Sequence, residues 1–208
     1  SAKVGTTYIY TVRAVKGSSV SGYDFSGISL KYVGTPTFSE VTADAYRVKL
    51  KWSSISGAEK YRIYRHSGDG DLTIITTTSS TSFTDTDVES GETYYYRVRC
   101  ADKDGNMSTS GFSTTYSSIT CLATPQLDSI HNETNGVVIT WKSVEGAERY
   151  QIYRKTNGSS WALIGTSTST SYRDSSAKSG TSYTYTVRAV KGTTLSWYNS
   201  SGLSVKRS

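Results

Sequence analysis

The residues whose side chains most often carry out chemistry are few and scattered. The chain has two histidines, His66 and His131, and two cysteines, Cys100 and Cys121. A catalytic base needs a nucleophile and an orienting group within hydrogen-bond reach, and neither histidine lies beside such a set. A zinc site needs several Cys and His ligands at close spacing, and that spacing is absent. The sequence therefore predicts no catalytic residue, no metal ligand and no cofactor.

Two acidic turns are the best candidates for binding an ion. The segment "DKDGN" (102–106) is similar to a calcium-binding loop, and "GDGD" (68–71) offers two carboxylates. A calcium loop of this kind also needs a distal bidentate Glu, which is missing here. Asp-Gly and Gly-Asn pairs are common in hairpin turns because they tolerate positive φ. We therefore interpret both segments as turns.

Composition favours strands and turns over helices. The 208 residues include 17 Tyr and 18 Gly but only 2 Pro, and 35% of the chain is hydrophobic. The net charge of +6 permits an acidic partner, but no Lys/Arg block of the kind that binds nucleic acid is present. No apolar run is long enough to predict membrane insertion. The first residues do not read as a leader, so we expect a signal peptide to be absent or already removed.

A repeat organises the whole chain. Trp52 recurs as Trp141 and Pro36 as Pro125, both at an offset of 89 residues. The phrase "GAEKYRIYR" (57–65) recurs as "GAERYQIYR" (146–154), and "SGETYYYRVR" (90–99) as "SGTSYTYTVR" (179–188). A constant period over a whole unit predicts repeated domains.

A third copy is present only in part. "SAKVGTTYIYTVRAVKGSS" (1–19) matches "SAKSGTSYTYTVRAVKGTT" (176–194) at an offset of 175 residues. The sequence thus predicts the last two strands of a repeat at 1–34 and complete repeats at 35–122 and 123–208. The joints "VGTP" (33–36) and "LATP" (122–125) are short, so we expect the repeats to stack end to end as a stiff rod.

Each repeat reads as short alternating strands. In "VKLKW" (48–52), Val48, Leu50 and Trp52 alternate with two lysines, which is typical of a half-buried strand. In "TYYYRVRCA" (93–101) the alternation buries Tyr94 and Tyr96. Turn residues such as "SGDGD" (67–71) separate these runs, and no helical period is found. The pattern predicts an all-β, immunoglobulin-like sandwich.

These motifs resemble fibronectin type III domains over essentially the whole chain. The resemblance lies in the Trp of one strand, the Tyr-x-Ile strand after it and the "G-x-x-Y-x-Y-x-V-R" strand. The "GAxxYxIYR" variant resembles those of extracellular, surface-attached or polysaccharide-degrading proteins of Gram-positive bacteria. The resemblance implies that the tryptophans lie between two sheets and that Tyr94 and Tyr183 form the "tyrosine corner" of the fold. The structural core is then expected to contain Trp52, Tyr61, Ile63, Tyr94, Tyr96, Trp141, Tyr150, Ile152, Tyr183 and Tyr185.

Two groups of residues are candidate ligand contacts. The first comprises aromatic residues in or near loops, namely Tyr23, Phe25, Phe112, Tyr116, Trp161, Trp197 and Tyr198. Such side chains stack on sugar rings or anchor proteins. However, Tyr23 and Tyr198 are equivalent across copies, which favours a packing role, whereas Gly22 stands in place of Trp197 in the first copy.

The second group is a basic Tyr/Arg sheet face with Arg62, Tyr64, Arg97, Arg99, Tyr153 and Arg188. This face suits anionic wall polymers or acidic glycans. The alternative is a cross-strand ladder that stabilises the sheet and keeps it soluble, and we prefer it.

The cysteines and the first residues complete the expectations. Cys100 and Cys121 are predicted to face inward but out of register, beyond disulfide reach, so we expect free thiols. The hairpin 1–34 exposes an apolar row containing Tyr8, Tyr10 and Val12, and this row predicts cover by the adjacent repeat or self-association.

We expect a non-catalytic spacer in a secreted or cell-surface bacterial protein. The alternative is an adhesion or binding module for a glycan or a host or bacterial surface protein.

Overall fold

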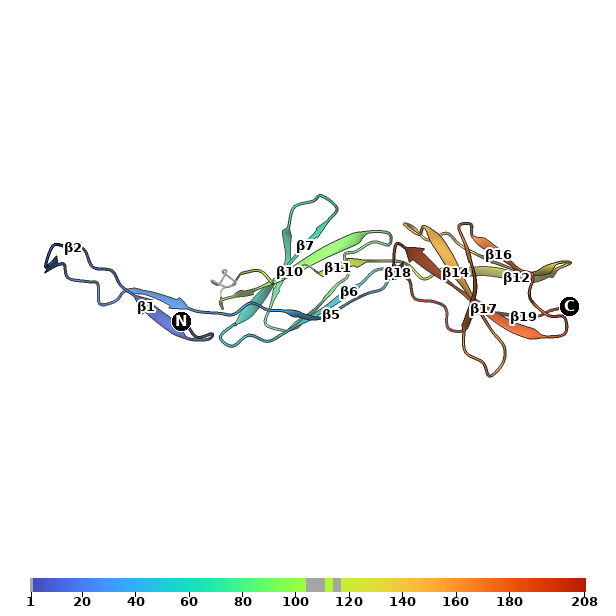
Figure 1. Ribbon diagram of the computed structural model, residues 1–208, viewed down its shortest axis with the longest axis horizontal. Coiled ribbons are helices and arrows are strands. Elements are labelled where there is room, and N and C mark those ends of the chain that lie inside the picture. Colours follow the sequence, from blue (N-terminus) through green and yellow to red (C-terminus); the bar gives the residue numbers. More distant parts are fainter. Residues whose placement is uncertain (1, 104–110, 114–116) are drawn as a thin grey trace. The chain divides into compact units, whose positions relative to one another are not determined.

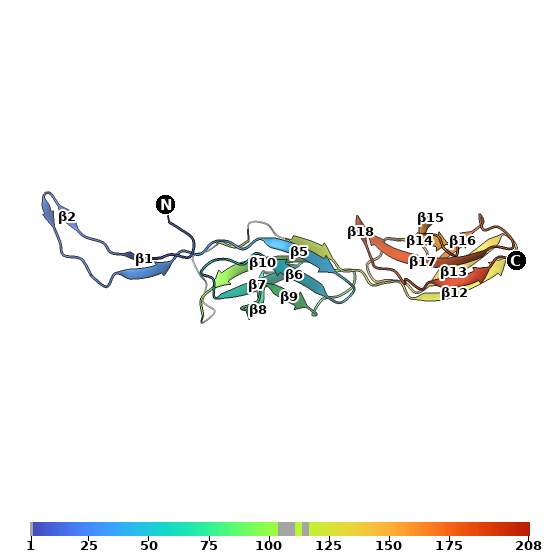
Figure 2. The same ribbon diagram turned by 90° about the horizontal axis from the view of Figure 1, so that it is seen from below.

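The computed structural model describes residues 2–103, 111–113 and 117–208. The described residues form β-strands and no helix, as the sequence predicts. They divide into two compact units. The first comprises Ser1–Val41, Leu50–Phe83 and Tyr95–Ser118, and the second comprises Thr42–Lys49, Thr84–Tyr94 and Ile119–Ser208. Most of the strands are labelled in Figure 1 or, from another side, in Figure 2.

The first strands form two paired ribbons. Strand β1 (Thr7–Tyr10) pairs antiparallel with β4 (Ile28–Lys31), and β2 (Val15–Lys16) pairs with β3 (Ser19–Val20). Apolar side chains of these strands remain in solvent, since Ile9 is 67% exposed and Ile28 is 76% exposed, and Val12 between β1 and β2 is 88% exposed. The hydroxyl of Tyr8 accepts a hydrogen bond from the Lys3 N–H at 2.6 Å.

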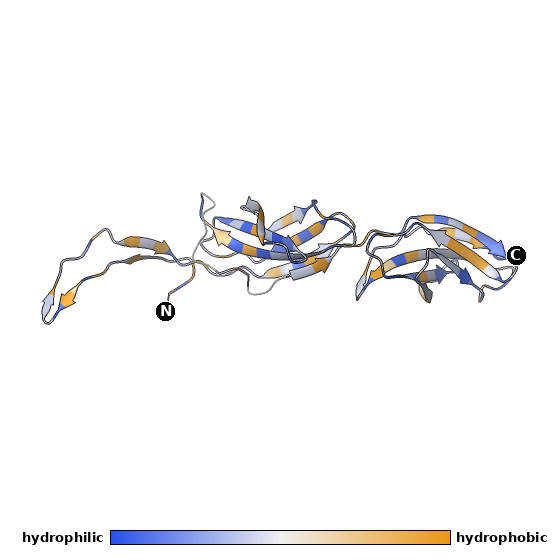
Figure 3. Ribbon diagram, turned by 90° about the horizontal axis from the view of Figure 1, so that it is seen from above, coloured by the Kyte–Doolittle hydropathy of each residue, from blue (hydrophilic) through white to orange (hydrophobic). Residues whose placement is uncertain are grey.

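The described residues between 38 and 120 form two sheets. Strands β5 (Phe38–Ala43), β6 (Val48–Trp52) and β9 (Ser82–Asp85) make a sheet in the order β5-β6-β9. Strands β7 (Lys60–Ser67), β8 (Thr73–Thr78), β10 (Thr93–Ala101) and β11 (Ser117–Thr120) make a sheet in the order β11-β10-β7-β8. Apolar and polar residues alternate along these strands, as the colours of Figure 3 show.

Residues 127–206 repeat this plan. Strands β12 (Leu127–Glu133), β13 (Gly136–Trp141) and β16 (Ser171–Asp174) form a sheet in the order β12-β13-β16. Strands β14 (Arg149–Lys155), β15 (Ala162–Ser167), β17 (Ser182–Lys191) and β18 (Thr194–Leu195) form a second sheet in the order β15-β14-β17-β18. Strand β19 (Leu203–Lys206) also pairs with β17.

The core of this last region contains side chains from both of its sheets. Trp141 is 3% exposed, and its ring lies edge-on to Tyr150 with a centroid distance of 5.3 Å. The equivalent rings of Trp52 and Tyr61 lie 5.6 Å apart. The repeated phrase after each tryptophan therefore supplies the side chain that packs against its indole ring.

The ten residues of the expected core are all buried. Each is between 0 and 6% exposed. The hydroxyls of Tyr94 and Tyr183 accept hydrogen bonds from the N–H groups of Glu89 and Lys178, five residues upstream, at 2.9 and 3.2 Å. Tyr8 makes the same bond in the first ribbon, so the arrangement occurs in all three copies.

A buried charge stands beside this core. Asp174 is 2% exposed, and its carboxylate accepts hydrogen bonds from the Tyr185 hydroxyl at 2.7 Å and the Arg154 guanidinium at 2.5 Å. Ser176 donates two more, from its N–H and its hydroxyl. Burial opposes ionisation, but these hydrogen bonds outweigh it and hold the pKa of Asp174 below its ordinary value. Burial and the Asp174 carboxylate raise the pKa of Tyr185.

Both cysteines are buried and free, as the strand register predicts. The Cys100 thiol donates to the Gly34 carbonyl at 3.4 Å. Burial, followed by the negative charges of Asp44 and Asp85, raises the pKa of Cys121 to about 11.

Candidate functional site

An aromatic cleft opens on the outer face of the sheet that contains β14 and β17. We define the cleft by its five lining residues, Tyr153, Trp161, Thr186, Arg188 and Tyr198, which enclose a cavity of about 190 Å³. Tyr153 comes from β14, and Thr186 and Arg188 come from β17. Trp161 directly precedes β15, and Tyr198 follows β18. Two aromatic side chains from loops are thus brought over a strand pair.

Strand alternation supplies the floor of the cleft. On β17 the side chains of Tyr185, Val187 and Ala189 point into the core and are fully buried. The residues between them, Thr186 and Arg188, therefore lie on the opposite face of the sheet. The Thr186 hydroxyl donates to the Asn199 carbonyl at 2.8 Å, which ties the loop after β18 to this face.

The loop that carries Tyr198 is held by hydrogen bonds to β17. Arg188 Nε donates to the Ser196 carbonyl at 2.7 Å, and the Ser196 hydroxyl accepts from the Ala189 N–H at 2.8 Å. The Arg188 guanidinium carbon lies 5.7 Å from the centroid of the Tyr198 ring. The Trp161 and Tyr198 rings meet edge to face, 6.1 Å apart at 75°. These contacts fix the ring of Tyr198 before any ligand arrives.

The cleft is positively charged. Lys155 Nζ lies 4.5 Å from the centroid of the Trp161 ring, and Arg188 lines the cavity itself. Neither cation forms an ion pair with a carboxylate among the residues that the structure describes. None of the five lining residues is acidic. The site therefore combines aromatic surface with positive charge that no carboxylate neutralises.

A polar pocket of about 310 Å³ is also lined by Lys155. Its other lining residues are Thr156, Asn157, Gly158, Ser159, Ser182, Tyr183, Thr184, Ser201 and Ser204. Because Lys155 lines this pocket and also lies over Trp161, the pocket adjoins the aromatic cleft. Hydroxyl and amide groups of this kind donate and accept hydrogen bonds.

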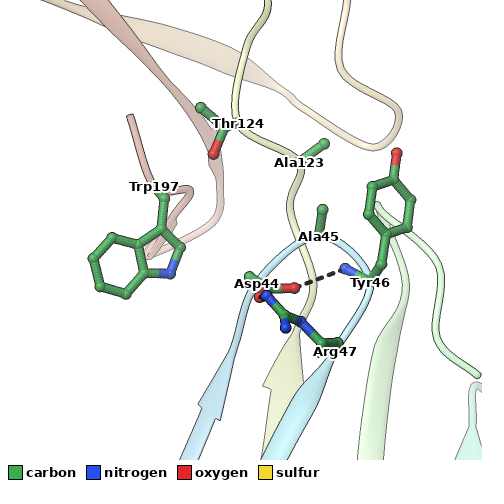
Figure 4. Close-up of a pocket in the computed structure, with 7 residues that line it drawn as sticks. All are labelled: Asp44, Ala45, Tyr46, Arg47, Ala123, Thr124 and Trp197. Carbon is green, nitrogen blue, oxygen red and sulfur yellow. Dashed lines mark hydrogen bonds and ion pairs between the residues drawn. The ribbon is translucent and has the colours of Figure 1, made fainter. Parts of the chain in front are cut away.

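The second compact unit has a further, more open pocket around Trp197 (Figure 4). Its cavity is about 660 Å³, and its lining residues are Asp44, Ala45, Tyr46, Arg47, Ala123, Thr124 and Trp197. Trp197 is 64% exposed and Tyr46 is 63% exposed. The Trp197 indole N–H donates to the Ala43 carbonyl at 3.4 Å.

The charges of this pocket are satisfied by each other. Asp44 accepts from the Tyr46 N–H at 3.1 Å and from Arg47 at 2.8 Å. Burial opposes ionisation of Asp44, but these bonds outweigh it and lower its pKa. Asp44 thus stabilises the turn that follows it. Because Asp44 and Arg47 neutralise each other, this pocket has less uncompensated charge than the aromatic cleft.

The basic sheet face of the middle repeat differs from the expectation in one respect. Alternation places Tyr64 outward, yet Tyr64 is only 6% exposed. The ring of Phe112 covers it, with a centroid distance of 5.0 Å. The guanidinium carbons of Arg97 and Arg99 lie 5.1 and 5.4 Å from the centroid of the Phe112 ring. The expectation that Tyr64 is exposed on this face is therefore wrong, because Phe112 packs on its ring.

The arginines of this face, Arg62, Arg97 and Arg99, are half-buried.

In the first copy, the Tyr23 and Phe25 rings lie 4.5 Å apart, and Phe25 is 85% exposed. Arg13 lies over Tyr23 at 4.8 Å, as Arg188 lies over Tyr198. Tyr116 lies outside the described residues.

The remaining chemical candidates have ordinary surroundings. The ring of His66 stacks on Tyr95 with a centroid distance of 4.6 Å, and His131 lies 3.4 Å from Glu133. Within the described ranges, no group of three or more His, Cys, Asp or Glu side chains could hold a metal ion. Residues 104–106 of the acidic turn lie outside those ranges. No helix in the described part of the chain is long and apolar enough to span a membrane.

Sequence reasoning named Trp161 and Tyr198 but did not bring them together, and it missed Lys155 and Thr186. Lys155 directly follows the strand "YQIYR" (150–154), so the sequence places a positive charge at the end of that strand. Thr186 is an outward position on β17 that the returning loop covers. Thr186 and Tyr198 come together only because the loop after β18 folds back over β17. No pattern in the sequence predicts this contact.

Comparison with known proteins finds family matches for two segments of the chain. Residues 36–116 match the family "Fibronectin type III domain SaeA third domain". Residues 127–195 match the C-terminal domain of GH85 endohexosaminidases. Among solved structures, a two-domain fibronectin type III segment of chicken tenascin is similar, with a TM-score of 0.47 and 18% identity. That similarity covers 82% of this chain and 98% of the tenascin segment.

The curated relatives are much longer proteins. Exoglucanase B of Cellulomonas fimi is 27% identical over 88% of this chain, which spans 18% of that enzyme. An amylopullulanase of Thermoanaerobacterium saccharolyticum is 41% identical over 30% of this chain and 5% of its own length. The family match over residues 36–116 and the recurrence of the same residues 89 positions later agree with the all-β fold. Residues 36–116 therefore belong to the fibronectin type III family, and residues 127–206 repeat the same plan of β-strands.

Proposed function

We propose that this chain is a non-catalytic accessory part of a secreted or cell-surface bacterial protein that acts on polysaccharides. In this proposal it serves as a spacer that holds its repeats at a fixed separation. The repeats are taken as 1–34, 35–122 and 123–208, the first being the end of a longer domain. The relatives support this role, because the chain matches only 18% of the exoglucanase and 5% of the amylopullulanase.

The observation that carries the proposal is a glycine pair that occurs twice. A Cβ on Gly57 would lie 2.9 Å from the Cα of Gly5, and a Cβ on Gly91 would lie 3.0 Å from the Cα of Gly146. Gly5 and Gly91 are equivalent, as are Gly57 and Gly146. All four have positive φ, between 74° and 92°. The same close backbone contact at both places supports a fixed spacing between successive repeats.

Hydrogen bonds surround the second glycine pair. The Ser90 hydroxyl donates to the Glu145 carbonyl at 3.2 Å and accepts from the Ala123 N–H at 2.9 Å. Lys191 Nζ donates to the Gly91 carbonyl at 2.5 Å. Because the joint 122–125 is short, forming each hydrogen bond costs little conformational entropy. Together these hydrogen bonds favour one arrangement over a flexible linker.

Small-angle scattering tests the spacer role. The parent chain is compared with a variant that carries a flexible Gly/Ser insertion between Thr124 and Pro125. We expect a single sharp separation between repeat centres in the parent and a broadened, shorter one in the variant. If the two scattering profiles coincide, the parent is already flexible at this joint and the proposal is wrong.

A binding role is the second candidate, and the aromatic cleft favours it. Aromatic side chains on a rigid sheet are suited to stack on sugar rings. A glycan array probed with the intact chain separates the two roles, since a pure spacer gives no hits.

A further inference from the structure

We propose that the aromatic cleft of the last repeat binds a pyranose ring that carries an anionic group, as part of an acidic oligosaccharide. This inference is independent of the spacer role, because it rests only on residues of the last repeat. A spacer that fails the scattering test can still bind a glycan here, and a cleft that binds nothing leaves the spacer role intact.

The size of the cleft sets the size of the ligand. Sites for drug-sized molecules are roughly 300–1,000 Å³, and the cavity here is about 190 Å³. A single sugar ring therefore matches it better than a larger flat molecule. Trp161 and Tyr198 meet nearly at right angles, so they form two walls of a corner. A pyranose stacks its apolar C–H face on one ring while its edge meets the other.

The charge of the cleft sets the chemistry of the ligand. The Arg188 side chain uses Nε for the loop carbonyl, and its two terminal nitrogens have no hydrogen-bond partner among the described residues. A guanidinium with free terminal nitrogens suits a carboxylate or sulfate group. Lys155 adds a second positive charge, 4.5 Å from the centroid of the Trp161 ring. A neutral sugar would leave both cations without a counter-charge, which argues for an acidic one.

The adjoining polar pocket suggests that the ligand is longer than one sugar ring, because it offers a second binding surface next to the cleft. Lys155 lines this pocket and lies over Trp161 of the cleft, and the pocket is otherwise lined mainly by Ser, Thr and Asn side chains. Hydroxyl-rich surface of this kind exchanges hydrogen bonds with sugar hydroxyls. A neighbouring sugar residue would then lie beside Lys155, with its own ring outside the aromatic corner. An acidic peptide fits less well, since it has no rigid ring to fill the corner.

In the middle repeat, the residue equivalent to Tyr153 is covered by another ring of the described residues. Tyr64 is the equivalent of Tyr153, and the phenyl ring of Phe112 packs onto it at 5.0 Å. In the last repeat, Tyr153 lines an open cavity instead. The two equivalent tyrosines therefore differ in their surroundings, since Tyr64 is covered by Phe112 and Tyr153 lines a cavity.

Isothermal titration of the intact chain tests the proposal with four probes of matched length. They are an oligogalacturonate, a sulfated galactan oligosaccharide, a neutral galactan oligosaccharide and a poly-glutamate peptide. We expect binding of at least one of the two acidic glycans, weakened by added salt. The stronger of the two identifies carboxylate or sulfate as the preferred group. Equal binding of the neutral glycan, or tighter binding of the peptide, would overturn the proposal, as would no binding of either acidic glycan.

Variants locate the site. Trp161→Ala should weaken binding by about tenfold or more, because it removes one wall and the ring beneath Lys155. Lys155→Gln should weaken binding of the acidic glycan severalfold with no loss of fold, and it should flatten the salt dependence. Trp197→Ala is the matched control, since Trp197 lies in the same loop as Tyr198 but does not line the cleft. If Trp197→Ala abolishes binding while Lys155→Gln does not change it, the ligand binds elsewhere and the assignment is wrong.

Discussion

The backbones of Gly91 and Gly146 touch without any side chain between them. A Cβ on Gly146 would overlap the Cα of Gly91, and a Cβ on Gly91 would lie 3.1 Å from the Glu145 carbonyl oxygen. Gly146 also has φ of +74°. Both requirements exclude larger residues, which explains why "SGAE" (56–59) has a glycine at the same place as "EGAE" (145–148).

We predict that Gly146→Ala loosens this contact without unfolding the sandwich. The added methyl group pushes on backbone atoms that cannot rotate away, so the hydrogen bonds of Ser90 should weaken. Hydrogen–deuterium exchange at Gly91 and Ala123 should accelerate while core amides stay protected.

Gly158→Ala is the matched control for Gly146→Ala. Gly158 has nearly the same φ, +75°, but no atom within 4 Å of an added Cβ. Both variants bear the same backbone strain, roughly 1 kcal/mol, and only one meets a neighbour. Equal exchange in the two variants would show that strain, not contact, is responsible.

A second prediction concerns Trp141. Its indole ring is 3% exposed and lies among Tyr150, Ile139 and Ile152 in the core. Trp141→Ala should reduce the free energy of unfolding by about 3–5 kcal/mol, because it removes a large buried ring and leaves a cavity. Chemical denaturation measures this loss. Trp197→Ala, at a site 64% exposed, should change stability little.

A third prediction follows from the hydrogen bond between Tyr185 and Asp174. Tyr185→Phe leaves the buried carboxylate with one donor fewer, so we expect a loss of about 1–3 kcal/mol at pH 7. The pKa of Asp174 is held below its unfolded value of about 3.9. The stability that the charge contributes is therefore fully present above that pH and is lost as the pH falls through the folded pKa.

The difference between parent and Tyr185→Phe should consequently shrink at low pH. Denaturation at pH 7 and near pH 2 measures it. Tyr198→Phe is the control, because the Tyr198 hydroxyl forms no hydrogen bond with the described residues. A difference that is the same at both pH values would contradict the role given to Asp174.

The β-strands could be predicted from the sequence because every second residue along them is buried. Val48, Leu50 and Trp52 are 0, 0 and 3% exposed, as their alternation with lysines predicts. The same rule failed at Tyr64, whose burial depends on Phe112, a loop residue 48 positions later. Alternation describes only neighbours along one strand, and it cannot anticipate a ring that returns from a distant loop.

The aromatic cleft was less predictable for the same reason. Trp161 and Tyr198 lie on different loops, and the hydrogen bond from Thr186 to the Asn199 carbonyl brings one of those loops over β17. The Asp174 site was missed as well, because its partners Arg154 and Tyr185 lie on other strands. Contacts of this kind depend on tertiary packing rather than on local pattern.

A fourth prediction concerns the thiols. Cys100 and Cys121 are both 0% exposed, and the pKa of Cys121 is about 11. At pH 8 about one Cys121 thiol in a thousand is ionised, and burial slows its reaction further. A chromogenic disulfide reagent should therefore detect almost no thiol in the folded chain and two per chain after denaturation. A mass two daltons lower than that of the reduced chain would instead indicate a disulfide.

The last prediction concerns the ribbons formed by residues 7–31. Val12 is 88% exposed, Ile9 is 67% exposed and Tyr10 is 55% exposed, so an apolar surface faces water beside an unpaired strand edge. Such an edge pairs readily with another chain. We expect the chain to self-associate with rising concentration in sedimentation velocity, and Val12→Lys should reduce this association by adding a charge to the surface. Ile74→Lys is the control, since Ile74 is 51% exposed but lies on β8. A parent chain that sediments as a monomer at every concentration, or an Ile74→Lys variant that dissociates as readily as Val12→Lys, would contradict association through this ribbon.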